Sequence, residues 1–143
     1  MKLDRITLVQ TTFTAVQSEA TLFAKRLYDH LFRLDPDLCR LFPAGTAEHG
    51  QTFMVGLAEI VKNLDRPFVL IQSTLKPLGL KHGRYNIDPA HYHTFATALQ
   101  AALAETLGDG YTSDVDSAWM ETYYLVVGVM RERTLKKGVI NDV

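Results

Sequence analysis

Two of the five histidines in this chain stand in surroundings that could support metal chemistry. His82 lies in the run Leu78-Gly79-Leu80-Lys81-His82-Gly83-Arg84-Tyr85, near the end of a short helix that Pro77 helps to start. Neutral imidazole is a good ligand for iron, which makes His82 a candidate metal ligand. The ordinary alternative is a capping or surface histidine, and the motif alone leaves both open.

His49 heads a stripe of apolar side chains, Phe53, Leu57 and Ile60, on one face of a predicted helix. A histidine in this place projects toward whatever the stripe covers; the alternative is a histidine at a helix start that points into solvent. The chain has no G-x-S-x-G, Gly-rich phosphate loop, C-x-x-C or H-E-x-x-H. The two histidines are therefore the leading candidates for chemistry.

Helices must position these histidines, because apolar residues recur every three or four positions along nearly the whole chain. Five such stripes lie within residues 6–16, 23–34, 53–64, 92–106 and 115–130. No segment shows the two-residue alternation of a half-buried strand. The pattern predicts an all-α fold with about six to eight helices.

Residues that favour helix starts and stops mark the boundaries. Asp35-Pro36 and Asp88-Pro89 each place a capping carboxylate before a proline that fits the first turn. Leu107-Gly108 is expected to end a helix, and Thr112 to begin the last one.

Size and composition limit the class of protein. The chain has 143 residues, 47% of them hydrophobic and 22% charged, as in one soluble domain with room for one enclosed ligand. A net charge of −1 gives no electrostatic reason to bind nucleic acid or an anionic membrane. With its lone Cys39 and no apolar signal core or membrane-spanning run, we expect a cytoplasmic protein without a membrane span.

Four motifs follow one another along the chain: Leu27-Tyr28-Asp29-His30-Leu31-Phe32; Asp35-Pro36-Asp37-Leu38 with Leu41-Phe42; Leu78-Gly79-x-x-His82-x-x-Tyr85-x-Ile87-x-Pro89-x-x-Tyr92; and Leu107-Gly108 with Ala118-Trp119-x-x-x-Tyr123. In this order they resemble segments of globins, in particular of bacterial single-domain haemoglobins, flavohaemoglobin globin domains and neuroglobin. The resemblance runs from about residue 5 to residue 133. It implies a single globin domain over residues 1–143, without a reductase domain.

The resemblance implies haem b, iron protoporphyrin IX, as the cofactor and His82 as its proximal iron ligand. It also implies that Phe42 packs on the porphyrin, that Tyr28 reaches into the distal pocket, and that Tyr92 supports the proximal histidine. Lysine and arginine beside His82 are expected to pair with the haem propionates, although they are nearly as well explained as surface residues. The remaining expected cofactor contacts are Phe53, Leu57, Leu78, Lys81, Arg84, Tyr85, Ile87, Phe95 and Leu99.

Two neighbouring residues compete for the distal position. A helix that turned Gln51 toward the cofactor would also turn Lys62 toward it, whereas one that turns His49 inward continues along the apolar stripe. Gly50 would then fall where globins favour a small residue against the second helix. We therefore predict His49 as the distal residue and as a candidate sixth iron ligand.

The resemblance implies a haem-containing globin that binds dioxygen, carbon monoxide and nitric oxide reversibly, for oxygen transport or storage. Nitric oxide dioxygenation, supported by a separate reductase, is an enzymatic alternative. A redox or gas sensor in which His49 coordinates the iron is another. A globin-fold interaction module without haem is the last.

Overall fold

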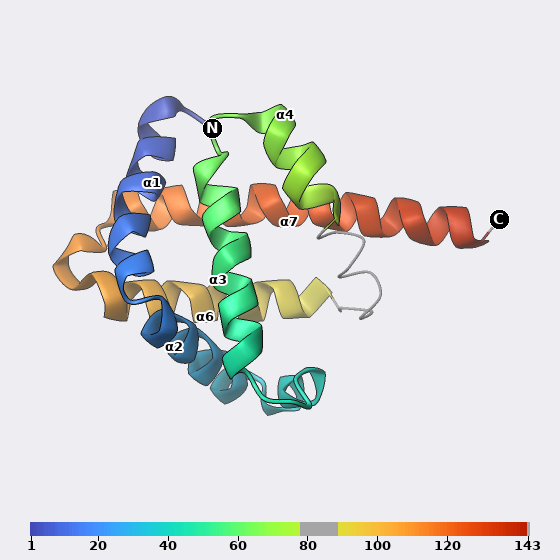
Figure 1. Cartoon of the computed structure of the whole chain (residues 1–143), viewed down its shortest axis with the longest axis horizontal. Helices are drawn as coiled ribbons and strands as arrows, with labels where there is room; N and C mark the ends of the chain where they lie inside the picture. The colour runs from blue at the N-terminus through green and yellow to red at the C-terminus, as the bar shows by residue number, and fades with distance from the viewer. Residues whose placement is uncertain (78–88, 143) are drawn as a thin grey trace.

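The computed structural model describes residues 1–77 and 89–142, and for Pro89 and residues 132–142 the description covers the backbone alone. Within these residues the chain forms helices and no strands (Figure 1). In chain order the elements are α1 (Leu3–Ser18), α2 (Ala20–Leu34), η1 (Pro36–Leu41), α3 (Ala47–Lys62), α4 (Pro67–Val69), η2 (Leu70–Leu75), α6 (Pro89–Leu107), η3 (Gly108–Gly110) and α7 (Ser113–Asp142). Six described elements are α-helices, so the predicted all-α fold is confirmed.

The two longest helices, α6 and α7, contact each other, and the helices of the first half of the chain cross them (Figure 1). α1 packs against α3, α6 and α7, while α2 packs against α3 and α6. As a result, side chains from α2, α3, α6 and α7 meet although they come from distant parts of the sequence. No described helix is long and apolar enough to cross a membrane.

Three predicted boundary residues act as expected, whereas Pro77, expected to help start a helix, lies in a helical stretch that already runs from Pro67. The carboxylate of Asp35 accepts a hydrogen bond from the backbone N–H of Asp37 at 3.2 Å, although the segment it starts is a short 3-10 helix. Gly108, with a φ of 55°, lies directly after the end of α6, in the left-handed region that favours glycine. The hydroxyl of Thr112 accepts from the N–H of Val115 at 3.2 Å and caps α7.

The apolar stripes form the core, with one correction. Ile6, Val9, Phe13 and Val16 of the first stripe are all buried. Leu34, the last member of the second stripe, is 51% exposed because α2 ends there and the chain turns into η1. The apolar spacing predicted Leu34 as a core residue, but the helix has already left the core at this position.

Gly50 sets how closely α3 approaches α2. A Cβ atom added to Gly50 would lie 3.2 Å from the Cβ of Ala24 and 3.6 Å from the Cε2 of Tyr28. The first of these distances is shorter than ordinary van der Waals contact. The two helices can therefore approach this closely because Gly50 has no side chain. The close approach of a small residue to the second helix is found as expected.

Candidate functional site

Tyr28 of α2 and His49 of α3 form a polar pair at the crossing of these helices. The Tyr28 hydroxyl lies 2.5 Å from Nδ1 of His49. Tyr28 is only 3% exposed, and burial raises the pKa of its hydroxyl, because the charged phenolate loses its hydration. The hydroxyl therefore keeps its proton at physiological pH.

Aromatic rings contact both members of the pair, although His49 itself remains exposed. Phe42, directly after η1, packs edge-on against His49 with ring centroids 4.6 Å apart and against Tyr28 at 5.4 Å. Phe32 lies 6.0 Å from Tyr28 and 5.5 Å from Phe42. Phe32 was not among the expected site residues, although its position four residues after Tyr28 on one helix face could have indicated it.

A second group of rings continues from α3 across α6 to α7. Phe53 packs against Tyr28 at 6.5 Å and against Phe95 at 5.8 Å. Phe95 in turn stacks on Tyr123, with ring centroids 5.9 Å apart and an interplanar angle of 11°. Tyr123 belongs to a quoted motif but had no expected role in the site. The nearly parallel stack places it directly behind Phe95.

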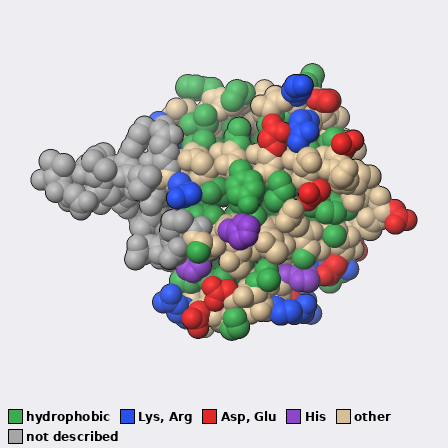
Figure 2. Space-filling model, turned by 180° about the vertical axis from the view of Figure 1, so that it is seen from behind, with side chains coloured by type: hydrophobic (Ala, Val, Ile, Leu, Met, Phe, Trp, Pro, Cys, Tyr) green, Lys and Arg blue, Asp and Glu red, His purple; other side chains and the backbone are tan. Residues whose placement is uncertain are grey.

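Several apolar side chains of this site are less covered than the core. Phe42, Phe53, Leu57 and Phe95 are half-buried, whereas Leu99 is 4% exposed and belongs to the core. Figure 2 shows histidine side chains standing among hydrophobic ones on the face opposite to that of Figure 1. A ligand that covered these half-buried apolar side chains would gain binding free energy from the apolar area that it removes from water.

Tyr92, at the start of α6, is tied to α7 by two contacts. Its backbone carbonyl accepts a hydrogen bond from the hydroxyl of Tyr123, and the guanidinium of Arg131 lies 5.9 Å from the centre of its ring. Burial raises the pKa of Tyr92, and the positive charge of Arg131 partly offsets that rise. α6 is thereby held to α7 next to the aromatic site.

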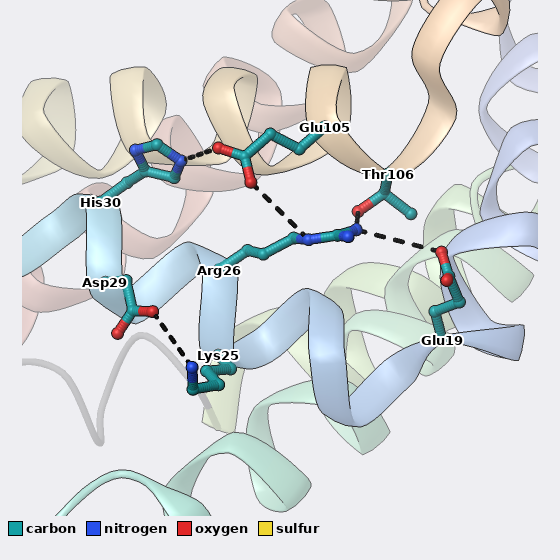
Figure 3. A network of polar contacts seen from close by, with 7 residues as sticks. All are labelled: Glu19, Lys25, Arg26, Asp29, His30, Glu105 and Thr106. Carbon is teal, nitrogen blue, oxygen red and sulfur yellow. Dashed lines mark hydrogen bonds and ion pairs between the residues drawn. The ribbon is translucent and has the colours of Figure 1, made fainter.

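A polar network fastens α2 to α6 (Figure 3). Arg26 lies 3.6 Å from a carboxylate oxygen of Glu105 and donates to the hydroxyl of Thr106 at 3.0 Å. The second oxygen of Glu105 bonds to Nε2 of His30. The network fixes the helix that carries Tyr28 against the helix that carries Phe95.

The two distal candidates and the residues expected around His82 remain to be placed. Gln51, the rejected distal candidate, is exposed, as is His49 itself, but only His49 makes the described ring and hydrogen-bond contacts with Tyr28. No group of three or more described His, Cys, Asp or Glu residues is arranged to hold a metal ion. Six expected residues lie outside the described residues: Leu78, Lys81, His82, Arg84, Tyr85 and Ile87.

Comparison with known proteins shows sequence similarity to one family. The family model described as Globin matches residues 25–130. A flavohemoprotein of Xylella fastidiosa is 31% identical over 140 residues, which are 94% of this chain and 35% of that protein. The haemoglobin subunit beta-A of Seriola quinqueradiata is 34% identical over 86 residues, covering 59% of this chain and 55% of the subunit. The chain thus spans about a third of the length of the flavohemoproteins that it matches.

Solved structures agree in fold. A protein described as an engineered carbene transferase, from a putative nitric oxide dioxygenase of Rhodothermus marinus, superposes with a TM-score of 0.89 at 21% identity, covering 100% of this chain and 99% of that one. A protein described as a hexacoordinated heme protein from an anhydrobiotic tardigrade gives a TM-score of 0.82 at 18% identity, covering 94% and 95%. At these identities the likeness concerns the fold alone.

Proposed function

The chain belongs to the globin family, and from that membership we propose that it is a haem protein that binds dioxygen and other diatomic gases reversibly. The observation that carries the proposal is the Tyr28–His49 pair, which contacts a group of half-buried aromatic side chains. This combination supplies polar donors within an otherwise apolar surrounding, as in most small-molecule sites.

The described residues fit a flat apolar cofactor. Phe42, Phe53, Leu57 and Phe95 supply aromatic and aliphatic surface that the protein leaves half-covered. With His82 as the proposed residue that holds the iron, haem would supply the iron to which a gas molecule binds. The single cysteine, Cys39, cannot provide a C-x-x-C-H attachment motif, which supports a non-covalent haem b and a reducing, cytoplasmic compartment.

The Tyr28–His49 pair would stabilise a partly negative ligand. Tyr28 is buried and keeps its hydroxyl proton, so its O–H is a donor from which a bound ligand would be able to accept a hydrogen bond. A hydrogen bond from a buried donor contributes about 1–3 kcal/mol, or roughly ten- to a hundredfold in ligand retention. The aromatic rings that contact Tyr28 would limit the access of water to this hydrogen bond and so strengthen it.

Nitric oxide dioxygenation is a second candidate, favoured by the flavohemoprotein relatives and by the description of the Rhodothermus marinus protein. In this reaction nitric oxide and dioxygen form nitrate, and a separate reductase would return the iron to its ferrous state. Turnover of nitric oxide with a generic reductase decides between the two functions. Nitrate formation no faster than with free haem contradicts the enzymatic one.

Absorption spectra of the purified protein test the main proposal. We expect uptake of one haem per chain and a ferrous spectrum that changes on addition of carbon monoxide. Two sharp visible bands in the ferrous state without gas would mean that His49 coordinates the iron; one broad band would mean an open site. His82→Ala should lose the haem signal, whereas His93→Ala, at an exposed position of α6, should retain it. Unchanged haem uptake in His82→Ala would overturn the assignment of the proximal ligand.

A further inference from the structure

A series of aromatic rings leads from the candidate site to the surface of α7. From Tyr28 it passes through Phe53, Phe95 and Tyr123 to Tyr124, and each step joins ring centroids 5.2–6.5 Å apart. The first and the last two members are phenols, which are far easier to oxidise by one electron than the phenylalanines between them. The rings therefore connect oxidisable groups inside the site with oxidisable groups outside it.

The two ends of the series differ in what can take up a phenol proton. At the inner end, Nδ1 of His49 lies 2.5 Å from the Tyr28 hydroxyl and offers a nearby base. Tyr123 instead donates to the backbone carbonyl of Tyr92, which is not a base, and burial raises the pKa of Tyr123. Tyr124 is 50% exposed, so solvent water is available to its phenol. An oxidised Tyr124 can therefore release its phenol proton irreversibly to solvent.

We propose that hydrogen peroxide, reacting at the haem site, oxidises Tyr124 by one electron through this series of rings, and that two chains so oxidised join through Tyr124 as a dityrosine cross-link. This inference rests on the proposed haem function. Tyr123 relays the electron from Tyr124 toward the site, and Phe95 lies between Tyr123 and Phe53 as the bridge. The exposed position of Tyr124 gives a second copy of the chain access to its ring.

The reaction balances with hydrogen peroxide as the oxidant. One peroxide takes up two electrons and two protons, its O–O bond breaks, and it leaves as two molecules of water. Two Tyr124 phenols each lose one electron and one proton. The two phenoxyl groups then form a carbon–carbon bond between their rings. The net change is one peroxide consumed and two hydrogen atoms removed for each cross-link.

The test treats haem-loaded protein with an equimolar amount of peroxide and locates the cross-link by tandem mass spectrometry of the covalent dimer. Rapid freeze-quench electron paramagnetic resonance records the radical before coupling. The wild type should give a tyrosyl signal and a dimer joined at Tyr124. Tyr124→Phe should lose the dimer, and Tyr123→Phe should lose most of it although Tyr124 is present. Tyr111→Phe, a phenol outside the ring series, should behave as the wild type.

A photo-oxidant in free solution separates the route from the accessibility of Tyr124. Without peroxide, it should cross-link the haem-loaded wild type and Tyr123→Phe equally, because it reaches Tyr124 from outside. A peroxide-driven dimer that is undiminished in Tyr123→Phe, or a radical or cross-link found on Trp119 or another tyrosine instead, overturns the inference. Its failure is distinct from failure of the proposed function, because absorption spectra report haem in every variant before peroxide is added.

Discussion

The hydroxyl of Tyr28 lies 2.5 Å from Nδ1 of His49, although the two residues come from different helices and lie 21 positions apart. They meet because Gly50, next to His49, lets α3 approach α2 at Ala24, one turn before Tyr28. The same pair gives the candidate site its donors. The close packing of Ala24 and Gly50 thereby brings Tyr28 and His49 within hydrogen-bond distance.

Replacing Tyr28 by phenylalanine should speed the release of dioxygen. The substitution keeps the ring contacts with Phe42 and Phe53 and removes only the hydroxyl that bonds to His49. We expect dissociation to be faster by roughly ten- to a hundredfold, corresponding to about 1–3 kcal/mol. Stopped-flow dissociation of dioxygen measures it, with Tyr111→Phe as the matched loss of a phenol elsewhere. An unchanged rate would show that Tyr28 does not stabilise the ligand.

Adding a methyl group at Gly50 should destabilise the fold, whereas adding one at Gly56 should not. In Gly50→Ala the new Cβ meets that of Ala24 at 3.2 Å, and overpacking of about 1–3 kcal/mol outweighs the better helix propensity of alanine. Gly56 lies in the same helix, and a Cβ added there would meet no described neighbouring atom within 4 Å. Because alanine favours a helix more than glycine does, Gly56→Ala should raise the free energy of unfolding by about 0.5–1 kcal/mol. Urea denaturation compares the two variants.

The double variant Ala24→Gly with Gly50→Ala provides the control for this mechanism. Moving the methyl group from one helix to the other should recover part of the lost stability, beyond the sum of the single changes. If the two changes are simply additive, the clash with Ala24 is not the cause.

Alkaline pH should weaken the fold through one buried and two half-buried tyrosines. Burial raises the pKa of Tyr28, Tyr111 and Tyr123, so the folded chain holds protons that the unfolded chain loses above about pH 10. The unfolded state is then favoured, and the free energy of unfolding falls as pH rises from there. Tyr28→Phe should make this fall shallower by up to about 1.4 kcal/mol per pH unit. Denaturation curves at pH 8, 10 and 11 measure the slope, and equal slopes for both proteins would contradict the role of Tyr28.

Removing Glu105 should cost more stability than removing Asp29. Glu105 joins Arg26 and His30 of α2 to α6, whereas Asp29 pairs only along its own helix with Lys25 at 3.8 Å (Figure 3). We expect Glu105→Ala to lower the free energy of unfolding by about 1 kcal/mol and Asp29→Ala by less than about 0.5 kcal/mol. High salt should reduce the difference, because it screens exposed charges. Equal losses at low salt would show that the network adds nothing to the contact between α2 and α6.

The helical class followed from local rules, because apolar spacing and capping residues act within one or two turns. Gly108 and Thr112 mark helix ends in the structure as they do in the sequence. Leu34 did not follow the rule, since where a helix leaves the core depends on the next segment. The 3-10 form of η1 was likewise not visible in the Asp35-Pro36 signal.

Parts of the candidate site could also be predicted, but with less detail. Helix-face reasoning favoured His49 over Gln51, and in the structure His49 is the one in contact with Tyr28 and Phe42. The stack of Phe95 on Tyr123 was not predicted, because it joins α6 to α7 across 28 residues and depends on how these helices cross. The spacing of residues in the sequence also could not predict that Nδ1 of His49 faces Tyr28, because this depends on side-chain geometry.

The contact between Ala24 and Gly50 has a consequence for the evolution of this sequence. The two positions share a single small volume at the crossing of α2 and α3, so a larger residue at one is tolerated only with glycine at the other. Across an alignment of relatives, residue size at these positions should covary inversely. A lineage that exchanged the two residues would keep the helix crossing while moving the methyl group from α2 to α3, to the position next to His49 in the sequence.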